Sequence, residues 1–231
     1  MSDDRKIKVS VIMPCRNEGN TVGACIDEVR SFFDARNIAG EIIVVDNCSD
    51  DESASIAMDH GARLIVEDMV GYGNAVRCGL NNASGEILII ADCDMTYDFE
   101  DMDPIIDLLN DGYDMVVGNR FEGGIEKGAM PISHKVGGRF LSCLANKRFG
   151  SGIYDFHCGL RGIRREALNQ LDLKTTGMEF ATEMVACAKK AGLKITETPV
   201  RLKKCNADRR SKLNTIRDGM RHLIYILFGG R

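Results

Sequence analysis

The 231-residue sequence predicts an α/β protein in which helices flank a mostly parallel sheet. Short apolar runs, typical of strands buried on both faces, alternate with segments of helical period. Polar residues cluster where several of these runs end. The chain is long enough for one large domain with a substantial core. It contains no run of 18 apolar residues, so we expect no membrane-spanning helix.

Predicted strands and helices alternate regularly in the first half of the chain. Helical spacing of Val22, Ile26 and Val29 predicts a helix over residues 21–36, and a further helix follows residues 71–75. Because strands and helices alternate at this spacing, neighbouring strands are expected to run parallel. The predicted strands of this half occupy residues 8–13, 41–45, 62–66, 87–91 and 115–118.

The second half contains two predicted amphipathic helices, over residues 131–149 and 213–228. Between them we predict a compact segment around residues 154–161, a helix at 179–190, a strand at 193–202 and a basic loop at 203–212. Each amphipathic helix could bury its apolar side in the core or in a contact between two copies of the chain, or could lie on a membrane surface. The apolar positions are Ile132, Val136, Phe140, Leu141 and Leu144 in the first, and Leu213, Ile216, Met220, Leu223 and Leu227 in the last.

The net charge of −4 hides a strong asymmetry. Residues 1–126 carry 26 acidic and 9 basic side chains, whereas residues 127–231 carry 8 acidic and 21 basic ones. The basic half is therefore suited to an anionic partner. Stacking aromatic residues are not interleaved with the basic ones, which argues against nucleic acid and favours substrate phosphates or an anionic membrane surface. The nine cysteines show no C-x-x-C pairs, which fits reduced thiols in the cytoplasm.

Two acids one residue apart, Asp92 and Asp94, follow the apolar run at residues 87–91. Carboxylates at the end of a buried strand cost desolvation free energy unless a cation neutralises them. The carboxyl ends of parallel strands are also where ligands bind in open α/β sheets. The pair therefore predicts a divalent cation, Mg²⁺ or Mn²⁺, held together with substrate phosphates. The alternative is a polar strand exit whose acids point into water.

Other predicted strands also end in polar residues, which should converge on the same edge of the sheet. For Asn17, Asp46 and Asn47 taken singly, turn formation or helix capping is an alternative to ligand binding. Gly71 and Gly73 could likewise form only a tight turn. They do not make the G-x-G-x-x-G dinucleotide fingerprint, and the sequence has no P-loop. The polar clusters are Asn17 with Glu18, Asp46 with Asn47, and Asn119 with Arg120.

Taken together, these motifs resemble those of the inverting family 2 glycosyltransferases of the A-type fold, and among them the polyprenyl-phosphate sugar synthases such as dolichyl-phosphate glucose and mannose synthases. The resemblance extends from Val9 to about Leu227. It implies a catalytic domain at residues 1–212 followed by a C-terminal amphipathic helix at 213–231. The motifs that carry it are residues 14–18, 45–47, 71–75, 92–98, 118–124, 130–135, 155–161, 177–180 and 210–212.

The resemblance also implies roles for individual residues. The nucleoside of the donor would contact Pro14, Asn17, Glu18, Asp46 and Asn47, with Gly71 and Gly73 letting the backbone approach it closely. Asp92 and Asp94 would hold the metal and the diphosphate. Arg120, His134, Lys135, Arg210 and Lys212 would bind an acceptor phosphate, and Asp155 would orient these cations or the metal shell. Asp94, Arg120 and Asp155 are therefore the predicted catalytic residues.

The expected activity is metal-dependent transfer of a hexose from a nucleoside diphosphate sugar, with UDP slightly favoured over GDP, to a polyprenyl phosphate. The enzyme would attach peripherally to the cytoplasmic face of a membrane. An acceptor hydroxyl on a soluble glycan or protein is the alternative, with Asp155 as its base. A non-catalytic nucleotide-sugar-binding module is the third reading. The sequence has no tryptophan, hence no Q-x-x-R-W motif, which argues against a processive polysaccharide synthase.

Overall fold

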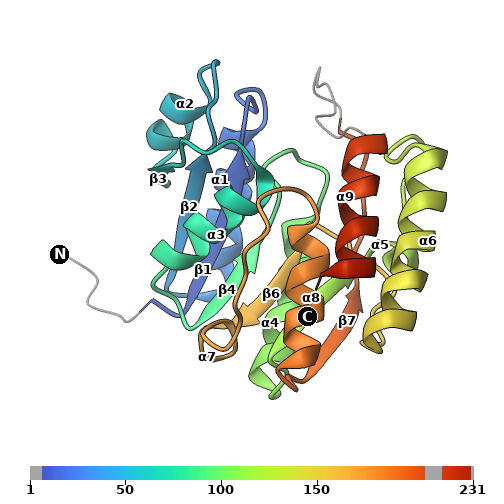
Figure 1. The fold of residues 1–231 in the computed structure, drawn as a ribbon. Helices are drawn as coiled ribbons and strands as arrows, with labels where there is room; N and C mark the ends of the chain where they lie inside the picture. Colours follow the sequence, from blue (N-terminus) through green and yellow to red (C-terminus); the bar gives the residue numbers. More distant parts are fainter. Residues whose placement is uncertain (1–6, 206–214, 230–231) are drawn as a thin grey trace.

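The structure, a computed structural model, describes residues 7–205 and 215–229. Its centre is a seven-stranded sheet in which only β6 runs antiparallel to its neighbours (Figure 1). The predicted α/β fold with a mostly parallel sheet is therefore confirmed. In spatial order the strands are β3 (Arg63–Val66), β2 (Gly40–Asp46), β1 (Val9–Cys15), β4 (Ile87–Ile90), β6 (Arg161–Arg164), β5 (Met115–Asn119) and β7 (Ile195–Pro199).

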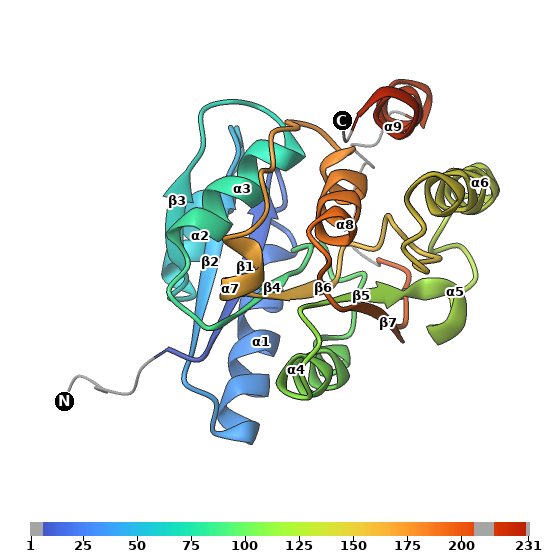
Figure 2. The same cartoon turned by 60° about the horizontal axis from the view of Figure 1, so that its bottom comes forward.

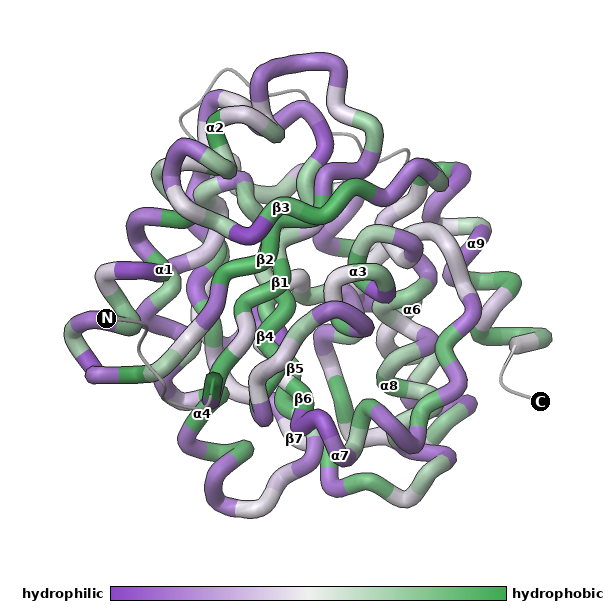
Figure 3. Tube along the Cα trace, turned by 90° about the vertical axis from the view of Figure 1, so that its left-hand side faces the viewer, coloured by the Kyte–Doolittle hydropathy of each residue, from purple (hydrophilic) through white to green (hydrophobic). Residues whose placement is uncertain are grey.

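Helices cover both faces of the sheet, which explains why β1, β2 and β4 consist mainly of apolar residues. Figure 2 shows α1 and α4 on one face and α3 and α8 on the other. All four residues of β4 are buried, and in Figure 3 the strands β1, β2 and β4 form the hydrophobic centre of the molecule. The helices are α1 (Val22–Arg36), α2 (Ser53–Asp59), α3 (Tyr72–Asn82), α4 (Met102–Asn110), α5 (Arg120–Gly123), α6 (Ile132–Phe149), α7 (Arg165–Leu168), α8 (Phe180–Lys190) and α9 (Thr215–Phe228), with a short 3₁₀ turn, η1 (Phe99–Asp101).

Two parts of the sheet differ from the prediction. β6 was not predicted, because its sequence, Arg-Gly-Ile-Arg, lacks the apolar continuity of the other buried strands. The last strand is shorter than the predicted residues 193–202. After Pro199 the chain leaves the sheet edge, and Leu202 instead forms isolated bridges with Tyr97 and Ile125.

Helices α6 and α9 lie side by side at one end of the molecule (Figure 1). His134 on α6 and Thr215 on α9 are joined by a hydrogen bond of 2.7 Å. α9 is also tied to α8, because His222 bonds Thr182 and Arg221 pairs with Glu179. No helix in the described ranges is both long and apolar enough to cross a bilayer.

The apolar stripes of α6 and α9 are largely exposed. Ile132 and Ile216 expose 81% and 80% of their surface, respectively. Leu141 and Leu144, by contrast, pack against the core. Burial in the core of this chain therefore accounts for only part of the predicted apolar sides. We call the exposed set the apolar surface; it comprises Ile132, Val136, Phe140, Ile216, Met220, Ile224, Leu227 and Phe228.

Candidate active site

The acid pair lies directly after β4, at the edge of the sheet where the parallel strands end. Asp94 is buried, and its Oδ1 accepts hydrogen bonds from the backbone N–H of Thr96 at 3.0 Å and from the Thr96 hydroxyl. Met95 between them adopts a left-handed backbone with φ of 61°. This turn holds the Asp94 carboxylate in one orientation.

Asp92 lies against the backbone of the loop between α6 and β6. A Cβ at Gly159 would be 2.1 Å from Asp92 Oδ2, so only glycine allows this approach. The loop is held there because the Gly159 N–H donates to the Tyr97 hydroxyl at 2.9 Å. The Asp155–Arg161 motif and the acid pair, distant in sequence, are therefore packed together.

The two carboxylates fit a metal that arrives with its substrate. Within residues 7–205 and 215–229, no group of three or more His, Cys, Asp or Glu side chains is placed to enclose a cation. Mg²⁺ and Mn²⁺ prefer oxygen ligands, and Mg²⁺ is commonly bound by one or two carboxylates together with substrate phosphates and water. Asp92 and Asp94 are thus suited to hold such a cation once a diphosphate completes the shell.

The loops after β1 and β2 are cross-linked by the predicted nucleoside-binding residues. Asn17 has a left-handed backbone, and its Oδ1 accepts from the N–H of Asp50 at 2.9 Å. The N–H of Glu18 donates to Ser53 Oγ at 2.8 Å. Pro14 lies beside Val45 near the end of β1. These contacts make a rigid rim at the sheet edge; contact with a nucleoside stays a prediction.

Asp46 and Asn47 lie in the same rim but differ in how their polar atoms are used. Asp46 is buried, and its Oδ1 has no hydrogen-bond partner among the described residues. A buried carboxylate oxygen without a partner is costly, and a ligand hydroxyl or N–H would satisfy it. The Asn47 amide instead donates to the carbonyls of Glu67 and Met69 and accepts from Gly71 N–H at 2.7 Å. Asn47 therefore shapes the loop before α3.

Gly71 and Gly73 allow two segments of the chain itself to approach each other closely. A Cβ at Gly71 would be 2.2 Å from the carbonyl oxygen of Thr176, and one at Gly73 would be 2.5 Å from that of Thr175. Gly71 also has a φ of 153°. The glycines allow the segment before α8 to approach the start of α3. Close approach of the backbone to a donor at these glycines stays a prediction.

Arg120 and Asp155 form a buried, bidentate ion pair. Nε and Nη2 of Arg120 each donate to one Asp155 oxygen at 2.7 Å, and the Arg120 backbone N–H donates to Oδ2 at 3.1 Å. Asp155 is only 1% exposed. Burial alone would lower the pKa of Arg120, but Tyr97 and Asp155 raise it well above its ordinary value. The guanidinium is therefore charged and held in a fixed orientation.

Glu197 on β7, which the sequence did not single out, supports this pair. Its Oε1 accepts from the N–H of Asp155 at 2.6 Å, and its Oε2 accepts from Asn119 Nδ2 at 3.2 Å. Asn119 Oδ1 in turn accepts from the N–H groups of Phe121 and Glu122 at the start of α5. Burial raises the pKa of Glu197. A glutamate within a strand was the only sequence signal for this role.

The remaining predicted acceptor-binding cations are less closely grouped. His134 and the exposed Lys135 lie near the start of α6, where His134 bonds Thr215. The guanidinium of Arg139, one helical turn after Lys135, lies 4.5 Å from the ring centre of Phe121 and so links α6 to the helix that begins at Arg120. Arg210 and Lys212 lie outside the described residues.

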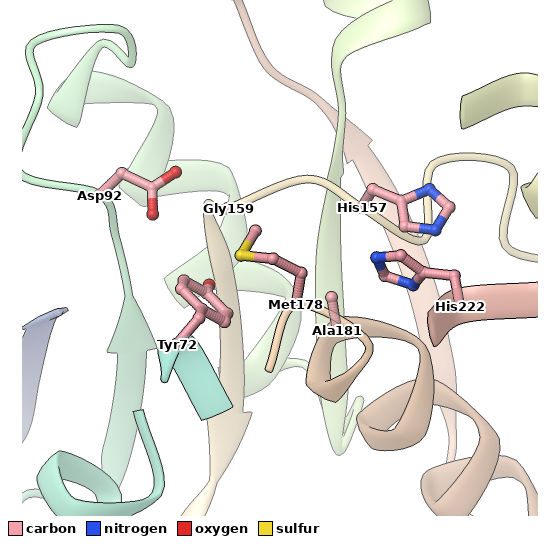
Figure 4. A pocket seen from close by; sticks show the side chains of 7 residues that line it. All are labelled: Tyr72, Asp92, His157, Gly159, Met178, Ala181 and His222. Atoms are coloured by element: carbon pink, nitrogen blue, oxygen red, sulfur yellow. The ribbon is translucent and has the colours of Figure 1, made fainter. Parts of the chain in front are cut away.

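Asp92 also lines a pocket that contains residues the sequence analysis did not predict as site residues (Figure 4). His157 and Met178 fall inside motifs that carried the resemblance, but His222 lies on α9 and had no local signal. The pocket is lined by Tyr72, Asp92, His157, Gly159, Met178, Ala181 and His222.

A sheet of this kind, with an acid pair after its central strand, is typical of A-type glycosyltransferases. The chain belongs to glycosyl transferase family 2, whose sequence profile matches residues 10–172, and the resemblance inferred from its motifs is confirmed. A low-salt glycan biosynthesis hexosyltransferase, Agl6, of Haloferax volcanii is 35% identical over 221 residues, which are 95% of this chain and 53% of that protein. This chain thus spans about half the length of Agl6. A dolichyl-phosphate hexose transferase of the same organism is 32% identical over 193 residues, 83% of this chain and 81% of that protein.

Solved structures share the fold. Glucosyl-3-phosphoglycerate synthase from Mycobacterium tuberculosis, in complex with Mn²⁺, UDP-glucose and phosphoglyceric acid, superposes with a TM-score of 0.76 at 21% identity, over 95% of this chain and 78% of that one. Mannosyl-3-phosphoglycerate synthase from Rubrobacter xylanophilus superposes with a TM-score of 0.75 at 22% identity, over 96% and 72%. At these identities the likeness establishes the A-type fold.

Proposed function

We propose that this chain transfers a hexose from a nucleoside diphosphate sugar, with UDP favoured as the nucleotide, to a polyprenyl phosphate at the cytoplasmic face of a membrane. A relative named as a dolichyl-phosphate hexose transferase supports the acceptor class, and a structural neighbour bound to UDP-glucose and Mn²⁺ supports the donor and the cation. The catalytic unit would comprise residues 1–212, with residues 213–231 as the amphipathic helix.

The observation that carries this proposal is the apolar surface of α6 and α9. A polyprenyl chain does not leave the bilayer at low cost, so the enzyme must bring its site to the lipid. Ile132, Val136 and Phe140 are spaced four residues apart on α6, and the exposed Lys135 and Arg139 flank them. Buried apolar area together with attraction of cations to anionic lipid holds such helices at an interface. A soluble acceptor would require no such surface.

The ion pair between Arg120 and Asp155 supports a phosphate acceptor. A phosphate oxygen of the acceptor is already anionic near neutral pH, so it needs positioning rather than a strong base. Both oxygens of Asp155 are engaged by Arg120, which leaves this carboxylate poorly placed to deprotonate a hydroxyl. The geometry thus favours a phosphate acceptor over the alternative hydroxyl acceptor. Arg120, with His134, Lys135, Arg210 and Lys212, would bind that phosphate.

The reaction is a displacement at the anomeric carbon of the hexose. A phosphate oxygen of the acceptor forms the new bond to this carbon, while the bond to the donor's diphosphate breaks and its electron pair leaves with the nucleoside diphosphate. Attack from the opposite side inverts the anomeric configuration. A bound Mg²⁺ or Mn²⁺ would stabilise the charge on the leaving diphosphate. Asp92 and Asp94 would hold this cation beside the bond that breaks.

We expect the protein to float with anionic vesicles at low salt, to bind neutral vesicles much more weakly, and to be released as salt rises. Replacing Ile132 and Ile216 together by Glu should reduce the bound fraction at least about tenfold, because both side chains would insert into lipid. Met58→Glu is the matched control, since Met58 is 55% exposed on α2, away from the apolar surface. Wild-type protein that remains soluble with anionic vesicles at low salt would contradict the membrane acceptor.

A further inference from the structure

Two histidines from distant parts of the chain meet on one side of the pocket that Asp92 lines. His157 belongs to the loop before β6, and His222 lies on α9. Their rings are nearly perpendicular, at 89°, with centres 4.4 Å apart. Figure 4 shows this histidine pair across the pocket from Asp92, with Tyr72 and Met178 between them.

Hydrogen bonds orient the pair. Nδ1 of His222 lies 2.8 Å from Thr182 Oγ1, which fixes the ring so that Nε2 is the nitrogen left for the pocket. Nδ1 of His157 lies 3.5 Å from Ser142 Oγ. Its Nε2 is buried and has no hydrogen-bond partner among the described residues. A buried ring nitrogen without a partner is costly, and a hydroxyl group of a bound ligand would satisfy it.

The chemistry of the lining selects the kind of ligand. None of the seven lining residues is Lys or Arg, so the pocket offers no cation to a second phosphate. Burial lowers the pKa of His222 to about 4, and burial together with His222 lowers the pKa of His157 well below its ordinary value. Two neutral imidazoles offer both donors and acceptors, which suit hydroxyl groups. Tyr72, Met178 and Ala181 add apolar surface for the C–H groups of a sugar ring.

The position of the pocket agrees with this chemistry. Asp92 is the residue assigned to the metal and diphosphate, and the hexose of the donor is attached directly to that diphosphate. A donor held at Asp92 would therefore extend its hexose across the pocket toward the histidine pair. The nucleoside, in contrast, is assigned to the rim around Asp46, the last residue of β2.

We propose that His157 and His222 bind hydroxyl groups of the donor's hexose, so that α9 completes the sugar pocket and the pair contributes to the choice of hexose. The inference rests on the donor half of the proposed function and not on the acceptor. It gives α9 two roles, because the same helix presents Ile216 and Met220 of the apolar surface on its exposed side. The sugar pocket is thus assembled in part from a helix that faces the proposed membrane.

The test compares the dissociation constants of a nucleotide sugar and of the free nucleoside diphosphate, both with Mn²⁺, by calorimetry. His222→Asn retains a group that can bond Thr182 but removes Nε2. We expect it to weaken nucleotide-sugar binding about tenfold or more and to change nucleoside diphosphate binding less than about twofold. His157→Asn should behave in the same way. His222→Gln, whose amide reaches the Nε2 position, should recover part of the affinity.

A donor lacking the contacted hydroxyl provides a second readout. At least one nucleotide sugar that lacks a single hydroxyl group should bind the wild-type protein more weakly than the complete nucleotide sugar does. The same deoxy sugar and the complete sugar should bind His222→Asn equally, because this variant cannot contact the missing hydroxyl in either case. His60→Asn is the control, since His60 pairs with Asp27 outside the pocket. Equal weakening of both ligands would assign the pair a structural role, and unchanged affinities would exclude contact with the sugar. A wild-type protein that binds neither ligand would instead overturn the proposed donor.

Discussion

Replacing Asp94 by Asn is expected to reduce hexose transfer by about 10³-fold while leaving the fold intact. The amide oxygen of Asn can still accept from Thr96, so the turn after β4 is preserved. A neutral amide is a much weaker ligand than a carboxylate for a hard divalent cation. The loss corresponds to about 4 kcal/mol of transition-state stabilisation.

Initial rates at saturating Mn²⁺, together with the melting temperature, measure this effect. Asp103→Asn is a suitable control, because it also removes one carboxylate but from an ion pair with Arg36. The control should retain wild-type rates. Wild-type turnover by the Asp94 variant would show that Asp94 does not hold the metal.

The second large effect is expected from Asp155→Asn. The substitution leaves the Arg120 guanidinium without its counter-charge. It also places the N–H₂ group of the new amide opposite the N–H donors of Arg120. Breaking a buried ion pair in this way costs about 3–5 kcal/mol, which in a protein of this size lowers the melting temperature by roughly 10 °C. Activity should also fall, because Arg120 is no longer held in one orientation for the acceptor phosphate.

A matched surface pair separates this effect from the loss of a charge alone. Asp172 pairs with Lys174 at 2.6 Å, but both side chains are more than 70% exposed. Asp172→Asn should therefore leave the melting temperature close to that of the wild-type protein. If Asp155→Asn lost activity with unchanged stability and abolished the dependence of the rate on an acidic group, Asp155 would be a general base and the acceptor a hydroxyl.

The sequence predicted the parts of the fold that depend on local patterns. The five strands of the first half consist mainly of apolar residues, and the acids of the central site follow one of them directly. β6 could not be predicted in this way, because Arg161 is fully buried with its guanidinium bonded to the carbonyls of Phe156, Cys158 and Ala181. Hydrogen bonds that satisfy a buried guanidinium in the folded chain leave no periodic pattern of apolar residues in the sequence.

Local sequence patterns also could not identify two residues of the candidate site. His222 reaches the pocket only because α9 packs on α8, and Glu197 reaches Asp155 only because β7 pairs with β5. Amphipathic period identified the helices at residues 131–149 and 213–228, but it could not show which apolar side chains would face solvent. In the structure Leu141 and Leu144 pack inward, whereas Ile132 and Val136 remain exposed.

The most direct measurement is transfer of labelled hexose to acceptors that differ in one feature. The protein is supplied with a nucleotide hexose, Mn²⁺ and anionic vesicles that contain polyprenyl phosphate, the corresponding polyprenol or neither, and in a parallel sample with a soluble phosphate monoester. We predict metal-dependent incorporation of label into the lipid fraction only with polyprenyl phosphate, and a product of the mass of the glycosylated lipid phosphate. Transfer to polyprenol or to the soluble phosphate, with none to polyprenyl phosphate, would contradict the proposed acceptor.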